Sequence, residues 1–213
     1  MSFEFNEDTH TYRFEEEEIP SVSEILRFIS NDIYGVKRDS KAALGKAADR
    51  GSRIHRAAEE IDRTGMTDCD PDIVQYVSAY VQFLKDHDVK WELIETPILR
   101  LSPYKYAGTL DRYGVVDGKR MLIDIKSTRT IGKKEKLMYE TQLNAYSEAH
   151  YIQTSPTTLS AKTIGVDEMA VLQLKADGTY KLIPVAKNDE IWWLCMRLHD
   201  ELNKTKSKRK KAS

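Results

Sequence analysis

A small set of charged residues lies between positions 108 and 128, in the segment GTLDRYGVVDGKRMLIDIKST. Asp111, Asp124 and Lys126 have the residue types and spacing that suit binding of a divalent cation, with an amine beside it. Mg²⁺ and Mn²⁺ prefer oxygen ligands such as carboxylates, and a lysine beside the cation can orient a water molecule. Whether the three side chains meet depends on the strands that carry them.

The sequence predicts that the two carboxylates face each other across a β-hairpin. Asp117-Gly118 lies between two runs rich in branched and aromatic residues, and Asp-Gly is a strong signal for a two-residue type I′ turn. With that turn, continuing the register places Asp111 opposite Asp124, in a non-hydrogen-bonded pair. Strand alternation then places Lys126 on the same face as Asp124.

Two carboxylates that face each other repel, and this destabilises a hairpin unless another charge compensates. At about 5 Å and an effective dielectric near 20, the repulsion is about 3 kcal/mol, which is large beside the ~5–15 kcal/mol stability of a domain. Lys126 compensates in part, and a divalent cation bound to both carboxylates compensates better. For these three residues taken alone, a solvated surface hairpin with scattered charges is the simpler alternative.

Composition limits the class of protein. The chain has 213 residues, 40% hydrophobic and 31% charged, which is enough for one sizeable core. No apolar run approaches the ~18 residues of a membrane span and the first residues are acidic, so we expect a soluble, cytoplasmic protein without membrane association. Cys69 and Cys195 are too few and too far apart for a zinc or iron–sulfur site. The net charge of −1 confines nucleic-acid contacts to local basic patches, such as 132–136 and 204–213.

Periodicity and turn signals predict an α/β fold with a mixed central sheet flanked by helices. Helices are predicted after Pro20, capped by Ser21 or Ser23, and over 41–65, 70–88, 133–152 and 189–202. Strands are predicted in a hairpin over 3–14, at 91–101, at 106–116 and 120–127, and in a second hairpin over 168–185. We expect Asp70 to cap its helix and the helix over 41–65 to break near Gly51. One domain is predicted over 1–203, with a hairpin and helices over 1–90, a core over 91–203, and a disordered basic tail over 204–213.

Other polar residues matter only if they lie near the hairpin. His55 is on the helix over 41–65, where a lone histidine is by default a surface or satisfied core residue. Glu95, on the strand before the hairpin, either joins the same face or is an ordinary strand carboxylate. Gln142 and Tyr146 are four residues apart on a helix and therefore share one face.

Taken in order, the segments GSRIH, the glutamate of LIETPIL, AGTLD, IDIKST and QLNAY resemble the RecB-type branch of the PD-(D/E)XK nuclease superfamily. The segment IPSVSEIL is similar to the entry segment of the compact virus-type and mitochondrial-maintenance exonucleases of that branch. The resemblance spans about residues 5–150. It implies a restriction-endonuclease-like core and Mg²⁺- or Mn²⁺-dependent cleavage of DNA, as an exonuclease that acts on DNA ends in replication, recombination or repair.

The resemblance also implies roles for the matching residues. Those implied to act in catalysis are Glu95, Asp111, Asp124 and Lys126. The implied metal ligands are His55, Asp111, Asp124 and the main-chain carbonyl of Ile125. The residues implied to contact the nucleic acid are Ser127, Thr128, Gln142 and Tyr146.

The chain departs from the family pattern at two points. Leu110 replaces the proline of the family motif, at a position that is not a ligand. The cysteine cluster of some relatives is missing and no phosphate-binding G-x-x-x-x-G-K-[ST] loop is present, so neither an iron–sulfur cluster nor a nucleotide cofactor is expected. The implied partners are DNA ends or single strands, with a strand-annealing protein or helicase as companion. The implied place of action is the inside of a cell, which for a virus-encoded protein is the host cell.

Two other classes of function stay open from the sequence. One is a non-catalytic nucleic-acid-binding or assembly protein that has kept the fold, against which the presence of His55, Asp111, Asp124 and Lys126 argues. The other is an unrelated metal-dependent hydrolase or a structural α/β domain.

Overall fold

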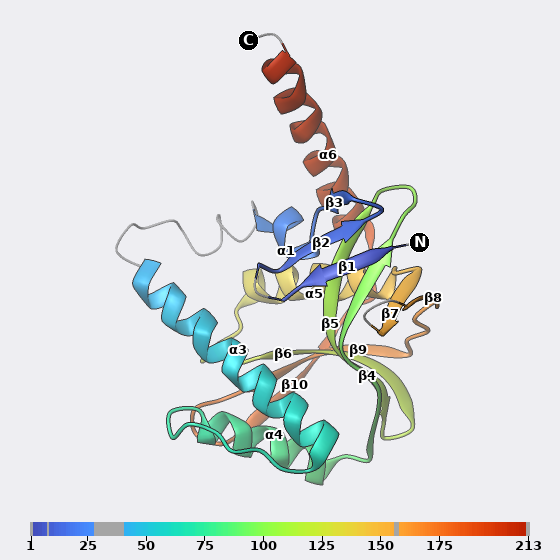
Figure 1. Cartoon of the computed structure of the whole chain (residues 1–213). Coiled ribbons are helices and arrows are strands. Elements are labelled where there is room, and N and C mark those ends of the chain that lie inside the picture. Colours follow the sequence, from blue (N-terminus) through green and yellow to red (C-terminus); the bar gives the residue numbers. More distant parts are fainter. Residues whose placement is uncertain (1, 8, 28–40, 156–157, 212–213) are drawn as a thin grey trace.

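The computed structural model describes residues 2–7, 9–27, 41–155 and 158–211, with backbone alone for 41–44 and 205–211. Near the N-terminus, β1 (Phe3–Asn6), β2 (Thr11–Phe14) and β3 (Glu17–Ile19) form a small antiparallel sheet (Figure 1). The predicted hairpin over 3–14 is confirmed, and Asn6 accepts the Thr9 N–H in its turn at 3.0 Å. This sheet packs against Leu99 and Ala107 of the main sheet.

The main sheet has the order β10-β9-β6-β5-β4-β7-β8 within the described residues. All neighbours are antiparallel except β6 and β9, which run parallel, so the sheet is mixed. The predicted mixed α/β class is therefore confirmed. The strands are β4 (Val89–Arg100), β5 (Tyr106–Val116), β6 (Lys119–Lys126), β7 (Tyr151–Ser155), β8 (Thr158–Ala161), β9 (Glu168–Leu174) and β10 (Tyr180–Val185).

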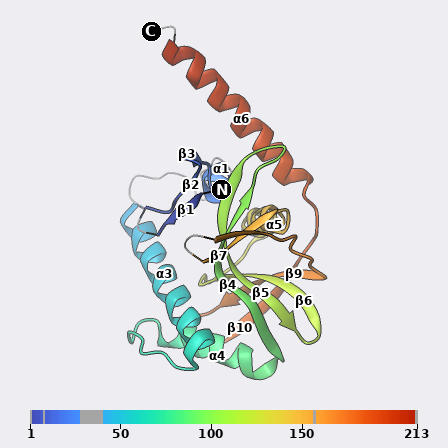
Figure 2. The same cartoon turned by 45° about the vertical axis from the view of Figure 1, so that its right-hand side comes forward.

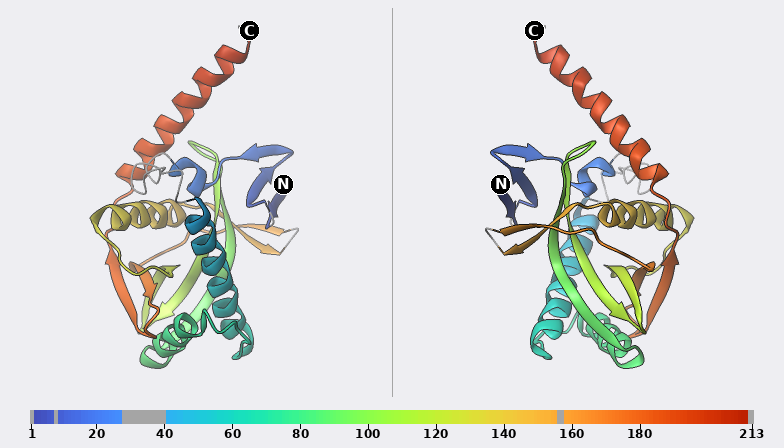
Figure 3. Two further views of the ribbon diagram at one scale, coloured as in Figure 1. Left: turned by 90° about the vertical axis from the view of Figure 1, so that its left-hand side faces the viewer. Right: turned by 90° about the vertical axis from the view of Figure 1, so that its right-hand side faces the viewer.

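Helices cover both faces of this sheet (Figure 3). One face packs against α1 (Val22–Ile25), α5 (Lys133–Ser147) and the first turns of α6 (Glu190–Lys211). The other face packs against α3 (Lys41–Thr64) and α4 (Val74–Asp86). Leu122 belongs to the first core and Ile123 to the second, which explains why β6 is apolar at consecutive positions.

The hairpin between β5 and β6 has the predicted turn. Asp117 and Gly118 both have positive φ values, 50° and 80°, as a type I′ turn requires. The pairing runs from Val116 opposite Lys119 to Arg112 opposite Ile123, in the predicted register. The predicted cross-strand pair of Asp111 and Asp124 does not form, because pairing between the two strands ends there although both strands continue. The strands β5 and β6 therefore separate at the step that carries the two aspartates.

Two predictions about helix ends and breaks are wrong. Asp70 does not cap α4, which begins at Val74, because the Asp70 carboxylate accepts a hydrogen bond from Arg53 Nη1 at 2.8 Å. Helix α3 continues through Gly51 without a break, since Ile54 and Ala58 of the following turns are buried against the sheet. By contrast Ser21 is confirmed as the cap of α1, where it accepts the Glu24 N–H at 3.0 Å.

The predicted helix over 133–152 is too long at its C-terminal end. It ends at Ser147, and Tyr151 and Ile152 begin β7 because they pair with Leu99 and Ile98 of β4. The strand β8 that follows was not predicted.

Of the tail predicted to be disordered over 204–213, residues 204–211 are helical, as the final turns of α6, which extends away from the sheet (Figure 2), and 212–213 lie outside the described residues. Lys204 forms ion pairs with Asp200 and Glu201 on the same helix, which favours its continuation. Among the helices of the described chain, none is both long enough and apolar enough to span a bilayer.

Candidate metal centre

Asp111 and Asp124 lie where β5 and β6 separate. Both side chains are buried, with 7% and 1% of the residue surface exposed. The Ile125 N–H, which would continue the pairing with β5, donates instead to Asp111 Oδ2 at 2.7 Å. The local opening of the sheet therefore gives one carboxylate a backbone donor and makes room for the second.

His55 reaches this point from α3. Its Nε2 lies 3.0 Å from the Ile125 carbonyl oxygen. Its Nδ1 lies 3.3 Å from Glu95 Oε1 and 3.7 Å from Asp111 Oδ2. Ligand atoms of His55, Glu95 and Asp111 lie within 4.8 Å of one another. Residues from α3, β4, β5 and β6 thus converge on one place, where the family resemblance implies that His55 and Glu95 join the hairpin.

Lys126 lies on the same side as Asp124. Its Nζ is 2.8 Å from both carboxylate oxygens and 5.1 Å from the centre of the Tyr139 ring. Only Oδ1 of Asp124 has the geometry of a hydrogen bond, and Oδ2, though buried, accepts none from the described residues. A buried carboxylate oxygen that accepts no hydrogen bond is an available metal ligand.

The electrostatics of the site favour a further positive charge. Burial raises the pKa of Asp124 to about 6, although the Lys126 ammonium opposes this shift. Burial also raises the pKa of Asp111, and the Glu95 carboxylate adds to the effect. At His55, burial disfavours the charged imidazole, but Asp111 and Glu95 outweigh it and raise the pKa to about 9. Negative charge therefore predominates around the imidazole of His55.

The residues present fit a divalent cation. Two carboxylates, an imidazole and a main-chain carbonyl are a suitable donor set for Mn²⁺ or Mg²⁺, and the imidazole favours Mn²⁺. Adjacent ligands of an octahedral ion with bonds of about 2.1 Å are about 3 Å apart. His55 Nε2 and the Ile125 oxygen, which are hydrogen-bonded to each other in this structure, already lie at that separation of 3.0 Å.

The predicted Gln142 and Tyr146 pair lies on α5 next to β5. Gln142 Nε2 donates to the Tyr146 hydroxyl at 2.8 Å, and burial raises the pKa of Tyr146 well above its usual value. Tyr146 is only 4% exposed, whereas Gln142 is half-buried and nearer the surface. The buried tyrosine hydroxyl therefore holds the Gln142 side chain in place. Gly108 permits this packing, since a Cβ there would lie 2.7 Å from Tyr146 Cε1.

The Gly108→Ala substitution is expected to lower the free energy of unfolding by about 1–3 kcal/mol, because the added methyl group displaces the buried Tyr146 ring. Urea denaturation measures the change. Gly165→Ala is the matched control, since a Cβ at Gly165 has no neighbour within 4 Å among the described residues. Equal stability of the two variants would contradict the packing role of Gly108.

Ser127 and Thr128 are half-buried at the end of β6. Ser127 lies close to α3, where a Cβ on Gly51 would be 3.8 Å from its hydroxyl. The Thr128 carbonyl accepts a hydrogen bond from Gln173 of β9 at 2.9 Å. The two residues therefore lie between α3 and β9, directly after Lys126.

Sequence reasoning missed Arg112, which follows Asp111 on β5 and has no exposed surface. It donates to Asp62 of α3 at 2.6 Å and to Glu95 of β4 at 2.8 Å. No local pattern reveals this group, because its partners are 50 and 17 residues away.

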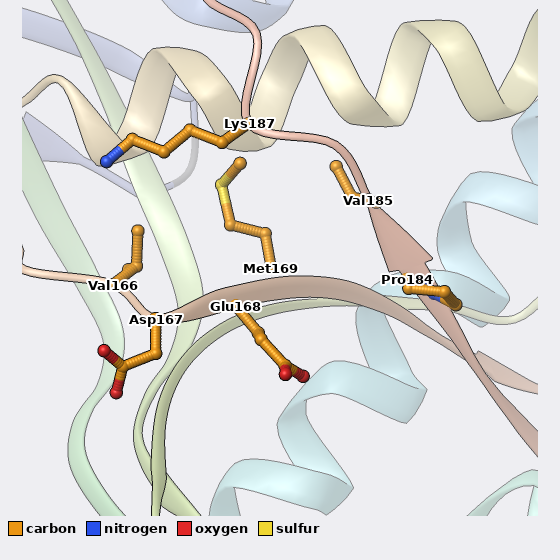
Figure 4. A pocket seen from close by; sticks show the side chains of 7 residues that line it. All are labelled: Val166, Asp167, Glu168, Met169, Pro184, Val185 and Lys187. Atoms are coloured by element: carbon orange, nitrogen blue, oxygen red, sulfur yellow. The ribbon is translucent and has the colours of Figure 1, made fainter.

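A pocket elsewhere in the fold is lined by other residues. Figure 4 shows Asp167, Glu168, Met169 and Lys187 around it, between β9 and the segment after β10. Glu168 is paired with Met121, toward the turn of the β5–β6 hairpin, whereas Asp124 is paired with Val171. The pocket and the carboxylate site therefore lie at different positions along the sheet.

Comparisons with known proteins give little information on function. No family model matches the chain, and no curated protein matches it. Among solved structures, it is similar to the crystal structure of SSO0001, at 14% identity and a TM-score of 0.46, over 89% of this chain and 76% of that one. The functional assignment therefore depends on the geometry of the site.

Proposed function

We propose that the protein is a metal-dependent DNA nuclease that hydrolyses phosphodiester bonds, as an exonuclease acting on DNA ends. One observation carries the proposal: His55, Glu95 and buried Asp111 cluster beside the Ile125 backbone where two strands separate, next to the buried Asp124 that holds the Lys126 amine. The resemblance to RecB-type PD-(D/E)XK nucleases supports the same reading, including a restriction-endonuclease-like core.

In this proposal, Asp111, Asp124, His55 and the Ile125 carbonyl hold one or two Mg²⁺ or Mn²⁺ ions. Bound there, the cation supplies charge that polarises the scissile phosphate and lowers the pKa of a water molecule. Asp111 stays oriented by the Ile125 N–H, and Asp124 by the Lys126 ammonium. These contacts fix the two carboxylates before substrate binds, which lowers the cost of organising the site.

Lys126 is the group placed to act on the reacting atoms. Its ammonium is held by Asp124 and lies over Tyr139, and 23% of its side chain is exposed. From there it orients the attacking water or donates to a phosphate oxygen as negative charge develops. Both roles need a positioned amine, not only a positive charge nearby.

DNA reaches the site over the end of β6 in this proposal. Ser127 and Thr128 supply hydroxyl groups there, and the exposed Arg129, Lys133 and Lys134 follow directly along the chain. Phosphate contacts of this kind position a strand without reading its sequence. Gln142, supported by Tyr146, is placed on α5 for the same purpose.

The proposal is tested by incubating the purified protein with linear and closed circular DNA, each single- and double-stranded, with Mn²⁺, Mg²⁺ or EDTA. We expect Mn²⁺- or Mg²⁺-dependent loss of linear DNA, no loss of closed circles, and no cleavage in EDTA. Cleavage of closed circular DNA would mean that the protein is an endonuclease and not an exonuclease. Binding without cleavage under every metal condition would contradict the proposal and favour a non-catalytic binding protein.

Lys126→Met is expected to lower the cleavage rate by about 10²–10⁴-fold, because it removes the amine and keeps the length of the side chain. Affinity for DNA and for Mn²⁺ should change only a few-fold, as measured by fluorescence anisotropy and calorimetry. Lys119→Met is the matched control on the same strand, since Lys119 lies at the turn end and pairs with Glu168. Wild-type cleavage by Lys126→Met would refute the catalytic role.

A further inference from the structure

Arg112 links three elements beneath the candidate metal centre. Its Nε donates to Asp62 Oδ2 of α3 at 2.6 Å, and its Nη1 donates to Glu95 Oε1 of β4 at 2.8 Å. The same Nη1 is 2.7 Å from the carbonyl oxygen of Asp111 on its own strand β5. A fully buried guanidinium thus joins the helix that carries His55 to the two strands that carry Glu95 and Asp111.

Asp62 is a rigid anchor for this guanidinium. Its side chain is 1% exposed, and besides Arg112 it accepts hydrogen bonds from the Tyr80 hydroxyl and the Trp91 indole N–H. These donors come from α4 and β4, so every oxygen of the carboxylate is held. Asp62 follows His55 by seven residues, which is two helical turns or about 10 Å along the same face of α3. The Asp62 contact therefore sets where His55 lies above the sheet.

Glu95 forms the other end of the link. It has a positive φ of 42°, which is uncommon for a residue other than glycine. Its Oε1 accepts from Arg112 at 2.8 Å and lies 3.3 Å from His55 Nδ1. A carboxylate that accepts from one ring nitrogen fixes the imidazole so that the other nitrogen is free to bind a metal. In this structure that other nitrogen, Nε2, donates to the Ile125 carbonyl oxygen at 3.0 Å, so a metal bound there would take the place of its proton.

We infer that Arg112 is a positioning residue: it holds Glu95 and Asp62 so that His55 presents Nε2 to the metal centre beside Asp111 and Ile125. This inference rests on the proposed function, because it assigns a purpose to the orientation of a metal ligand. In this inference Glu95 orients His55, and the Arg112 guanidinium neutralises the negative charge of Glu95. A purely structural ion pair would stabilise the fold without acting through His55.

The test uses a double-mutant cycle of Arg112→Lys and His55→Ala in the full chain. Lysine keeps the charge but cannot reach both Asp62 and Glu95 as the forked guanidinium does. We expect Arg112→Lys to raise the dissociation constant for Mn²⁺, measured by calorimetry, about 10–100-fold. In the His55→Ala background, Arg112→Lys should change the dissociation constant for Mn²⁺ less than about twofold, because the imidazole through which Arg112 acts is absent.

A matched control separates this role from general stability. Arg100→Lys removes a guanidinium of the same sheet that pairs with Glu148 at 2.9 Å and stacks on Trp193, away from the carboxylates. We expect it to leave Mn²⁺ affinity within about twofold of wild type. If Arg112→Lys does not fold, Asp62→Asn replaces it, since asparagine keeps the shape of the side chain and weakens the anchor.

A second readout does not need metal. The ring nitrogens of His55, observed by NMR in the metal-free protein, should shift in Arg112→Lys and stay at the wild-type position in Arg100→Lys. Unchanged His55 signals in Arg112→Lys, or equal losses of Mn²⁺ affinity with and without His55, would overturn the inference. If wild type binds no Mn²⁺, the proposed function fails, and the NMR comparison still decides the role of Arg112.

Discussion

Asp124→Asn is expected to remove Mn²⁺ binding at the site and to lower DNA cleavage by at least about 10²–10³-fold. The substitution keeps the size of the side chain and replaces one oxygen of a carboxylate whose Oδ2 is buried and accepts no hydrogen bond from the described residues. An amide carries no negative charge to hold a cation or the Lys126 ammonium. Calorimetry with Mn²⁺ and a cleavage time course measure the two effects.

The same substitution should not destabilise the protein. Burial raises the pKa of Asp124 to about 6, so at pH 7 the folded state holds a carboxylate that is harder to ionise than in the unfolded chain. Removing that charge is therefore expected to leave the free energy of unfolding at pH 7 unchanged or to increase it, by up to about 3 kcal/mol. Asp68→Asn, at an exposed position, is the control. A folded Asp124→Asn variant that cleaves DNA at the wild-type rate would contradict the role of Asp124 as a metal ligand.

Gly114→Ala is expected to have the largest effect on folding, a loss of about 3–4 kcal/mol or more. A Cβ at this position would lie 2.2 Å from the Lys90 carbonyl oxygen and 2.7 Å from Trp91 Cα. Both are backbone atoms of β4, beside the register shift between Trp91 and Leu93, so no rotation of a side chain relieves the contact. Urea denaturation and the yield of folded protein measure the loss.

Gly45→Ala provides the matched control for Gly114→Ala. A Cβ at Gly45 of α3 has no neighbour within 4 Å among the described residues, and alanine favours a helix. We expect a gain of about 0.5–1 kcal/mol from it. Equal effects of the two substitutions would mean that the close approach of β4 to β5 at Gly114 is not present.

Local signals were sufficient to predict the hairpin at the centre of the site. The Asp-Gly turn and the alternation beside it determine the register, and the structure has that register from Val116 to Arg112. The separation of the strands beyond this point was not foreseen, because it depends on the Asp111 side chain accepting the Ile125 N–H. The repulsion expected between Asp111 and Asp124 indicated that this part of the hairpin is unusual. Only the structure shows that the strands separate there.

Contacts between distant parts of the chain account for what the sequence did not show. Tyr151 continues a helical pattern in sequence, yet it forms a strand because β4 offers a free edge. Aspartate is a common N-cap residue, yet the carboxylate of Asp70 binds Arg53 and does not cap α4. Arg112 looks like an ordinary charged strand residue, and only the fold brings Asp62 and Glu95 to it.

The most direct test of the central claim is a crystal of the protein soaked in Mn²⁺, with the metal located by its anomalous scattering. We predict a peak about 2.0–2.3 Å from oxygens of Asp111 and Asp124, with His55 Nε2 and the Ile125 carbonyl among the remaining ligands. A well-ordered crystal with no peak between Asp111 and Asp124, or with the two carboxylates on opposite faces of the sheet, would contradict the proposed nuclease site.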